Sequence, residues 1–414
     1  MRPLLLALLA LLLSAPAADA ADAADAAFTP IADLPAAEVE SPEVLAFGEG
    51  GRGVVVSGAA SGVSATPTLK LITLPGGRTQ AFPRTQVIDS APRAAGGVDL
   101  LVRRGPELGR GDLILRRVLP TGRAYDLWSV RTAALEAAIA RRGRTVVVTW
   151  REGSALRFVS RRDGGIPTRP RTARLGLRGV NDLDLTLDAR GRRVVAVTSL
   201  RTGLLLASVS ARGGVLQRQV ARGVDGLVQL TRTRTGRIGA LVEDTGVEGD
   251  RGECVSDGRG RHIRVAVRER GAARFSAVQT IESPRFGCGS EGALLRALPD
   301  GRLIAIYQGG SYDFPPLLAR IAVAPEGRRF GPPATLAVDA RADTAAVAGG
   351  RLVIGLLRRT TEPELYTGAL SALVLDGAEQ PVAGTASAPV LDVDATGAAV
   401  LAWRAGNRLL VARS

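Results

Sequence analysis

A glycine followed by a short apolar run recurs at nearly even intervals along this chain of 414 residues. The intervals between successive copies are 46, 46, 48, 45, 65, 49 and 47 residues. The eight glycines are Gly51, Gly97, Gly143, Gly191, Gly236, Gly301, Gly350 and Gly397. A repeat of about 40 to 50 residues is typical of a chain built from similar units, each packing on its neighbours.

Each unit reads as a set of β-strands. In the third copy, Gly143 is followed by the β-prone runs Thr145–Trp150 and Ala155–Ser160, then by a turn at 163–165. Runs of about four to eight such residues between Gly and Asp turns are strand signals. Ala133–Ala140 has the alanine content of a helix, but its place in the repeat predicts a first strand.

Four strands in each unit predict an all-β fold, a β-propeller whose blades are four-stranded sheets arranged in a ring. We expect about eight blades, or seven if the weakly patterned second copy is not a blade. The last copy ends at Ser414 after three strands, so Phe28–Leu34 is expected to supply the fourth. Residues 28–414 would then form one domain, closed by an N-terminal strand in the C-terminal blade without free sheet edges.

Through its glycine-anchored blades the chain resembles exported bacterial propellers of the sialidase-like and WD-like repeat classes. A sialidase would show repeated Ser-x-Asp-x-Gly-x-x-Trp turns, and the nearest segment here, Ser256–Arg259, lacks the aromatic residue. The Gly-His and Trp-Asp pairs of WD repeats do not appear either. The resemblance therefore implies the fold and no particular activity.

The N-terminus predicts export. Met1-Arg2, the Leu-rich run Leu4–Leu13 and the small residues ending at Ala20 have the three regions of a signal peptide. The apolar run is about half the roughly 20 residues that span a bilayer. We expect a signal peptide over 1–20, an Ala/Asp-rich linker over 21–27, and a secreted monomer without a membrane span.

The net charge of +14 comes almost wholly from arginine, with Lys70 the single lysine. These arginines are spread evenly through the repeats, and no stretch interleaves them with stacking aromatic residues. Codon bias of a GC-rich genome explains such a composition, so no nucleic-acid partner is expected. A basic surface would still attract acidic glycans or envelope polymers.

Both cysteines lie inside the one long interval, between Gly236 and Gly301. Cys254 is expected in the loop between strands two and three of the fifth blade, and Cys288 in the link to the sixth blade. Since these connections leave an antiparallel blade at the same face, we expect a Cys254–Cys288 disulfide in an oxidising compartment. The alternative is a pair of buried free thiols.

Long loops on the same face of the next two blades extend this feature. They are expected near 308–316 and 359–366, and they gather carboxylates and aromatic rings in a basic, aromatic-poor chain. Such a mixture is typical of a recognition surface, although ordinary solvated loops would read the same way. The predicted binding residues are Glu253, Asp257, His262, Tyr307, Tyr312, Asp313, Phe314, Glu364 and Tyr366.

Few residues in the sequence suggest catalysis or metal binding. His262 is the only histidine, and no nucleophile is patterned around it, so the sequence favours a non-enzyme and assigns no catalytic or metal-ligating residue. No cofactor is expected; calcium held by the acidic insertion is the alternative, without a spaced D-x-D-x-D-G loop. We expect a binding or scaffold module for a glycan or envelope protein. The alternatives are a glycan- or ester-acting hydrolase or lyase using the same face, and a simple spacer.

Overall fold

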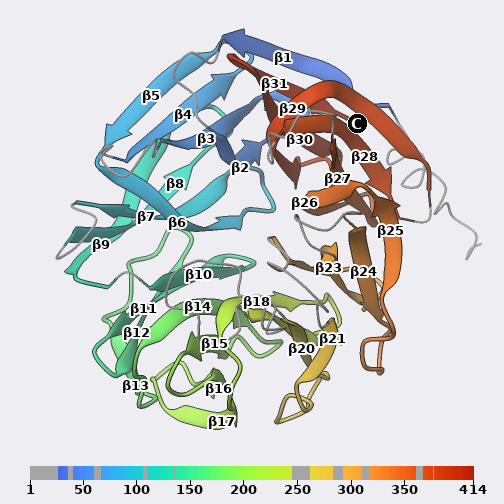
Figure 1. Cartoon of the computed structure of the whole chain (residues 1–414). Helices are drawn as coiled ribbons and strands as arrows, with labels where there is room; N and C mark the ends of the chain where they lie inside the picture. Colours follow the sequence, from blue (N-terminus) through green and yellow to red (C-terminus); the bar gives the residue numbers. More distant parts are fainter. Residues whose placement is uncertain are drawn as a thin grey trace, which may run out of the picture.

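The computed structural model describes residues 27–35, 41–59, 67–105, 111–134, 136–244, 262–282, 292–309, 318–359, 367–375 and 377–414. These residues form thirty-one strands and one short 3-10 turn, η1(Glu49–Gly51), and their sheets radiate from a common axis (Figure 1). The expected all-β propeller is confirmed. Six sheets have four strands and one has seven.

The first four blades follow one another along the chain. Blade one comprises β2(Ser41–Phe47), β3(Gly53–Ala59), β4(Thr68–Leu74) and β5(Arg78–Pro83). Blade two comprises β6(Thr85–Pro92), β7(Val98–Arg104), β8(Gly111–Val118) and β9(Ala124–Thr132). Blade three comprises β10(Ala137–Arg142), β11(Thr145–Glu152), β12(Ala155–Arg162) and β13(Arg171–Arg174). Blade four comprises β14(Val180–Leu187), β15(Arg193–Ser199), β16(Leu204–Val209) and β17(Val215–Ala221).

The remaining blades complete the ring. Blade five comprises β18(Gly226–Arg232), β19(Ile238–Asp244), β20(His262–Arg268) and β21(Gln279–Glu282). Blade six comprises β22(Leu294–Ala297), β23(Leu303–Gly309), β24(Leu318–Ala324) and β25(Ala334–Val338). The seven-stranded sheet contains β26(Ala340–Ala348), β27(Arg351–Arg359), β28(Thr367–Val374), β29(Glu379–Val393), β30(Ala399–Ala405), β31(Arg408–Arg413) and β1(Thr29–Pro35).

The seven-stranded sheet is two blades, because β29 belongs to both. The first part of β29 pairs with β28 as the outer strand of blade seven, and its last part pairs with β30 as the inner strand of blade eight. Seven sheets therefore make eight blades. The second repeat, whose weak pattern left a seven-bladed alternative open, forms the complete sheet β6–β9.

The chain closes on itself in blade eight. β1 pairs antiparallel with β31, from Thr29 opposite Arg413 to Pro35 opposite Arg408. Ile31 and Leu34 pack on a core shared by blades one and eight. The predicted closing strand is confirmed, as is a first strand in the Ala133–Ala140 region, which begins at Ala137.

The repeated glycines share one backbone requirement. All eight have a positive φ, between 53° at Gly143 and 97° at Gly236. In the turn before β15, the Gly191 N–H donates to the Asp188 carbonyl, and the Asp188 N–H donates to the Arg192 carbonyl. A residue with a β-carbon is strained in this conformation, so the first turn of each blade selects glycine.

Aliphatic side chains fill the spaces between blades. One cluster joins Ala138, Val147 and Leu156 of blade three to Leu183 and Val195 of blade four. Such packing suits a chain that is 46% hydrophobic but only 4% aromatic. Burial of these flat faces holds each blade against the next.

Hydrogen bonds also join several innermost strands to the next around the ring axis. A polar side chain on one strand accepts a bond from a main-chain N–H of the following blade. Four such contacts join Asp89 to Ile139 (2.8 Å), Asp182 to Val228 (2.7 Å), Gln229 to Leu295 (3.0 Å) and Thr344 to Leu391 (2.8 Å). Their separations of 50, 46, 66 and 47 residues follow the repeat, including its long interval.

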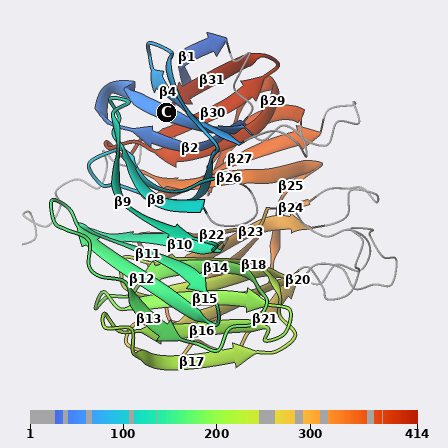
Figure 2. The same ribbon diagram turned by 90° about the vertical axis from the view of Figure 1, so that its left-hand side faces the viewer.

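The blade topology creates two distinct faces, which lie at the two sides of Figure 2. Hairpins between strands one and two, and between strands three and four, lie on what we call the turn face. Connections from strand two to three, and from each blade to the next, lie on the opposite loop face. The two faces can therefore carry different chemistry.

Removing the closing strand should open the ring. A chain beginning at residue 36 loses the β1–β31 ladder, in which each backbone hydrogen bond contributes about 1 kcal/mol. At about 2 °C per kcal/mol for a large domain, we expect a melting temperature roughly 10 °C lower, measured by circular dichroism. Size-exclusion chromatography should show self-association through the exposed edge of β31.

The matched control for this truncation is Asp33→Ala. Asp33 pairs with Arg408 while both side chains are about half exposed, and such a pair contributes little stability. Its melting temperature should stay within about 2 °C of wild type. A truncated chain as stable and monomeric as wild type would show that blade eight does not need β1.

The glycine requirement can be measured without a packing effect. At Gly397, where φ is 90°, an added β-carbon meets no atom within 4 Å. Gly397→Ala should therefore lower the free energy of unfolding by about 1 to 2 kcal/mol through backbone strain alone. Gly76, which is equally uncrowded and not left-handed, is the control. Equal denaturation midpoints for the two alanine variants would contradict the strain argument.

Candidate ligand-binding face

Three pairs of strand ends frame the predicted recognition surface. The end of β19 and the start of β20 flank residues 245–261; β23 and β24 flank 310–317; β27 and β28 flank 360–366. Because the strands alternate in direction, all these ends lie on the loop face of blades five, six and seven. The predicted segments are therefore attached to one face of the ring.

Most of the predicted binding residues lie outside the described residues. They are Glu253, Asp257, Tyr312, Asp313, Phe314, Glu364 and Tyr366. The same holds for Cys254 and Cys288. The binding roles of these residues, the disulfide and the calcium alternative in the acidic insertion stay predictions.

His262, one of the two described candidates, begins β20 at the loop face. It lies opposite Asp244 in the β19–β20 ladder and is half-buried. Its predicted binding role stays a prediction.

Tyr307 differs from its expected place on the exposed rim, because its side chain is fully buried. The ring packs between blades five and six, and the hydroxyl donates to Glu282 Oε2 at 3.2 Å. Burial, reinforced by the Glu282 charge, raises the pKa of Tyr307 well above its usual range. Glu282 also pairs with Arg320 at 2.9 Å, so Tyr307 belongs to an inter-blade contact and not to the rim surface.

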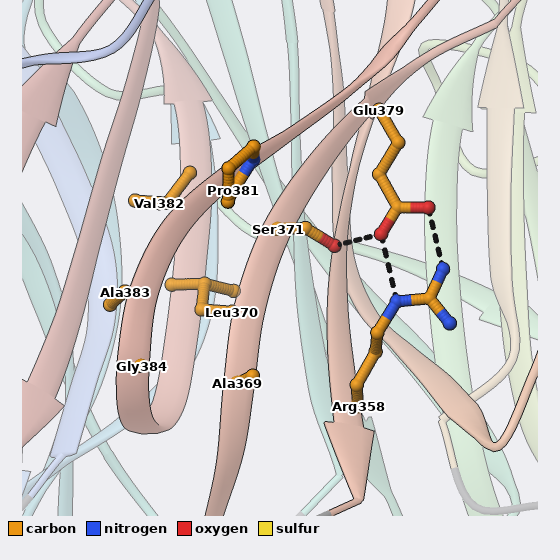
Figure 3. Close-up of a pocket in the computed structure, with 9 residues that line it drawn as sticks. All are labelled: Arg358, Ala369, Leu370, Ser371, Glu379, Pro381, Val382, Ala383 and Gly384. Atoms are coloured by element: carbon orange, nitrogen blue, oxygen red, sulfur yellow. Dashed lines mark hydrogen bonds and ion pairs between the residues drawn. The ribbon is translucent and has the colours of Figure 1, made fainter.

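The described part of the chain has a pocket of about 600 Å³ on blade seven (Figure 3). It opens between β28 and β29, where two register shifts interrupt the ladder near Leu370. Pro381, opposite Ser371, has no N–H to donate, so the ladder lacks that hydrogen bond there. The pocket is lined by Arg358, Ala369, Leu370, Ser371, Glu379, Pro381, Val382, Ala383 and Gly384.

An ion pair forms the polar wall of this pocket. Arg358 Nε lies 2.9 Å from Glu379 Oε1, and Arg358 Nη2 lies 2.5 Å from Oε2. The Ser371 hydroxyl donates to Glu379 Oε1 at 2.5 Å. The hydrogen bonds from Arg358 hold the pKa of Glu379 below its usual value. Both charged side chains stay about one-third exposed, so they remain accessible to a ligand.

The apolar wall faces this polar group. Pro381, Val382 and Ala383 line the pocket on the side away from the Arg358–Glu379 pair in Figure 3, and Leu370 is buried beneath them. A pocket with an apolar floor and a few convergent polar groups is typical of small-ligand sites. Nothing in the sequence singles out Arg358 and Glu379, because they lie on ordinary strands. Pro381 within a β-prone run was the available signal for an interrupted ladder.

Buried carboxyl groups near the ring axis form a second candidate. Asp89 uses Oδ2 to accept the Ile139 N–H and Oδ1 to accept the Ser90 N–H. Burial raises the pKa of Asp89 to about 7. Burial also raises the pKa of Asp184, with a further contribution from the charge of Asp89. Their oxygens bond to main-chain N–H groups, so these carboxyls hold blades together.

No metal centre emerges from the described residues. Within them, no group of three or more His, Cys, Asp or Glu side chains could hold a metal ion. The described ranges also contain no helix with the length and apolar character needed to cross a bilayer.

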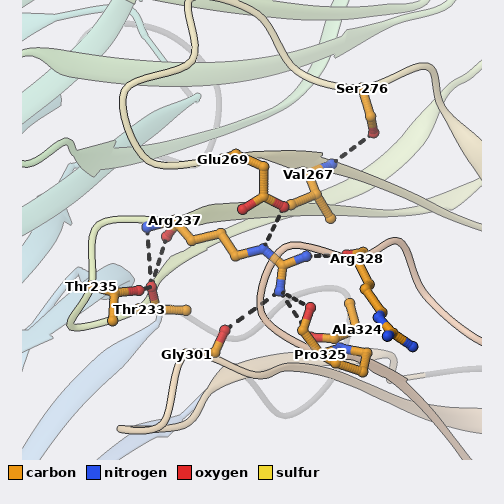
Figure 4. A network of polar contacts seen from close by, with 10 residues as sticks. All are labelled: Thr233, Thr235, Arg237, Val267, Glu269, Ser276, Gly301, Ala324, Pro325 and Arg328. Carbon is orange, nitrogen blue, oxygen red and sulfur yellow. Dashed lines mark hydrogen bonds and ion pairs between the residues drawn. The ribbon is translucent and has the colours of Figure 1, made fainter.

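Arg237 forms a third polar cluster, on the turn face (Figure 4). Its side chain is only 1% exposed and reaches from blade five into the turns of blade six. The guanidinium donates to the carbonyls of Ala324 at 2.9 Å and Pro325 at 2.7 Å, and it pairs with Glu269 at 2.9 Å. It therefore fastens blades five and six across the irregular interval and is not free to bind a ligand.

Comparisons with known proteins agree with the architecture. No protein-family model matches the chain. No curated protein matches it significantly. Among solved structures it is similar to the Dos1 propeller, with a TM-score of 0.56 and 9% identity over 93% of this chain and 95% of that one.

Two further structures are similar at lower scores. A protein from Lactobacillus plantarum aligns with a TM-score of 0.50 and 11% identity, over 82% of this chain and 94% of its own. The β-propeller domain of the trilobed protease from Pyrococcus furiosus aligns with a TM-score of 0.45 and 10% identity, over 80% and 93%. At such low identity the similarity shows the fold alone: the chain is a β-propeller.

The buried carboxyls predict an unusual pH dependence of stability. The folded protein holds the Asp89 proton up to about pH 7, whereas an unfolded aspartate releases it near 3.8. Between about pH 4 and 7 the folded state therefore binds more protons, and the free energy of unfolding falls as pH rises. Asp392, whose pKa burial raises to about 6, acts in the same direction.

Urea denaturation at pH 5, 6, 7 and 8 measures this dependence. Asp89→Asn keeps an oxygen to accept the Ile139 N–H but cannot titrate, so its stability should fall less with pH than that of wild type. Asp300→Asn alters an exposed ion pair and should keep the wild-type slope. An Asp89→Asn slope equal to that of wild type would assign the dependence to other groups.

Proposed function

We propose that this chain is an exported binding or scaffold propeller that recognises a glycan or an envelope protein through the loop face of blades five to seven. The observation that carries the proposal is the blade-seven pocket beside the predicted loop. Arg358 and Ala369, both in its lining, lie close to either end of residues 360–366 in the chain. A described pocket and a predicted recognition loop therefore share one blade.

The chemistry of the pocket suits a polar ligand with an apolar face. Arg358 can donate and Glu379 can accept, beside the apolar surface of Pro381 and Val382. A sugar ring presents hydroxyls at its edge and C–H groups on its face, and it can use both surfaces. A short peptide segment of an envelope protein offers a similar mixture.

The ring supplies the rigidity that a binding module needs. Arg358 Nη1 donates to the Val338 carbonyl of blade six at 3.2 Å, so the pocket wall is held by two blades. A preorganised wall loses little conformational freedom when a ligand binds. The predicted Cys254–Cys288 disulfide would restrict the blade-five loop on the same face in the same way.

Binding to an array of neutral and acidic glycans tests the proposal, with affinities then measured by calorimetry for the glycans retained. Arg358→Ala should weaken binding at least tenfold, because it removes the donor and leaves Glu379 without its partner. Arg302→Ala is the matched control, since Arg302 forms an exposed ion pair with Asp300 on the turn face of blade six. This variant should bind as wild type does.

The outcomes separate the alternatives. Wild-type affinity in Arg358→Ala would place binding away from blade seven. A protein ligand would be indicated if no glycan were retained, a purified envelope protein were bound, and Arg358→Ala abolished that binding. Release of products from a retained glycan would favour the hydrolase or lyase alternative.

A further inference from the structure

A group of arginines converges on the turn face of blade four. Arg142 ends β10 of blade three, Arg232 ends β18 of blade five, and Arg192 lies in the first turn of blade four between them. Arg142 Nη1 donates to the Asp188 carbonyl at 2.8 Å, and Arg192 Nε lies 2.6 Å from Asp188 Oδ2. Arg142 and Arg192 thus meet at one turn, and Arg232, at the corresponding end of the next innermost strand, lies near enough for the charges of Arg142 and Asp188 to act on it.

Asp188 is the carboxylate at the centre of this arginine group. Its Oδ1 accepts the N–H groups of Arg190 and Arg192, each at 2.9 Å. A fourth guanidinium, that of Arg268, reaches it only at 3.6 Å. Four arginines around one aspartate leave an excess of three positive charges in the group. The single Asp188 carboxylate can offset only one of these four charges.

Two arginines of this group have a lowered pKa. Burial lowers the pKa of Arg232, and the charge of Arg142 lowers it further. Burial likewise lowers the pKa of Arg268. Desolvated like charges at close range destabilise the folded state unless an anion compensates them.

A neighbouring cluster on the same face is closer to neutral. Between blades two and three, Arg117 and Arg141 each pair with both Asp99 and Asp163. Two cations and two anions share these four contacts. Arg93 lies near this cluster as well, and burial and the charge of Arg117 lower its pKa, so the excess there is one positive charge against three around Asp188.

We propose that Arg142, Arg192 and Arg232 form a binding site for a phosphate or sulfate group on the turn face of blade four. All three are half-buried, with part of each side chain open to solvent. Planar guanidinium groups match the oxygens of such an anion through paired hydrogen bonds. The group can be a free ion or the substituent of a phosphorylated or sulfated glycan.

The surface around the site is also positively charged. The first turns of blades three, four and five each carry one exposed arginine, namely Arg144, Arg190 and Arg234. They would attract an anion before it reaches the half-buried group. Because the site lies on blade four and the pocket on blade seven, it is independent of the glycan- or protein-binding function proposed above.

Thermal unfolding with added anions tests this site at constant ionic strength, with chloride as the reference ion. Sodium phosphate and sodium sulfate should raise the wild-type melting temperature in a saturable way. Arg232→Gln should bind phosphate at least tenfold more weakly. In chloride it should be as stable as wild type or more stable, because it relieves repulsion with Arg142.

Arg302→Gln, at the exposed pair with Asp300 on blade six, serves as the control and should keep the full phosphate effect. The proposal would be overturned if phosphate raised the melting temperature no more than chloride does. It would also be overturned if Arg232→Gln kept the full phosphate effect. Comparison of inorganic sulfate with a sulfated oligosaccharide identifies the source of the anion. Tighter binding of the oligosaccharide supports a glycan ligand, and equal binding supports the free ion.

Discussion

The antiparallel pairing of β1 with β31 is the contact on which the ring depends. It joins the two ends of the described chain in blade eight and gives β31 a hydrogen-bonded neighbour on its outer side. Without it, blade eight would have three strands and an exposed ladder edge. The core shared by blades one and eight uses Ile31 and Leu34 of this strand, so closure also completes the packing.

Contacts between innermost strands turn the closed ring into a rigid one. Asp89, Asp182, Gln229 and Thr344 each bind the main chain of the following blade, at separations that follow the repeat. The buried carboxyls gain these hydrogen bonds at the cost of desolvation, which raises the pKa of Asp89 and Asp182. Because these contacts lie inside the ring, each of its two faces can carry its own binding residues.

Charge is arranged differently on blade seven and on blade four. On blade seven, Arg358 and Glu379 neutralise each other beside apolar side chains, and a pocket of about 600 Å³ opens where the ladder is interrupted. On the turn face of blade four, Asp188 offsets only one of the positive charges of the arginines around it. The first arrangement suits an uncharged or mixed ligand, whereas the second requires an anion.

The sequence by itself determined the repeating unit, because a left-handed turn selects glycine and each blade repeats that turn; Gly191 and Gly236 are examples. It also predicted the closing strand, since the last repeat lacked one. It could not place Tyr307, whose strand position leaves open which neighbour covers it, nor the Arg358–Glu379 pair, whose partners are 21 residues apart across two strands. Only the tertiary structure decided these contacts and the convergence of Arg142 and Arg232 on Asp188, because they depend on how separate blades pack in space.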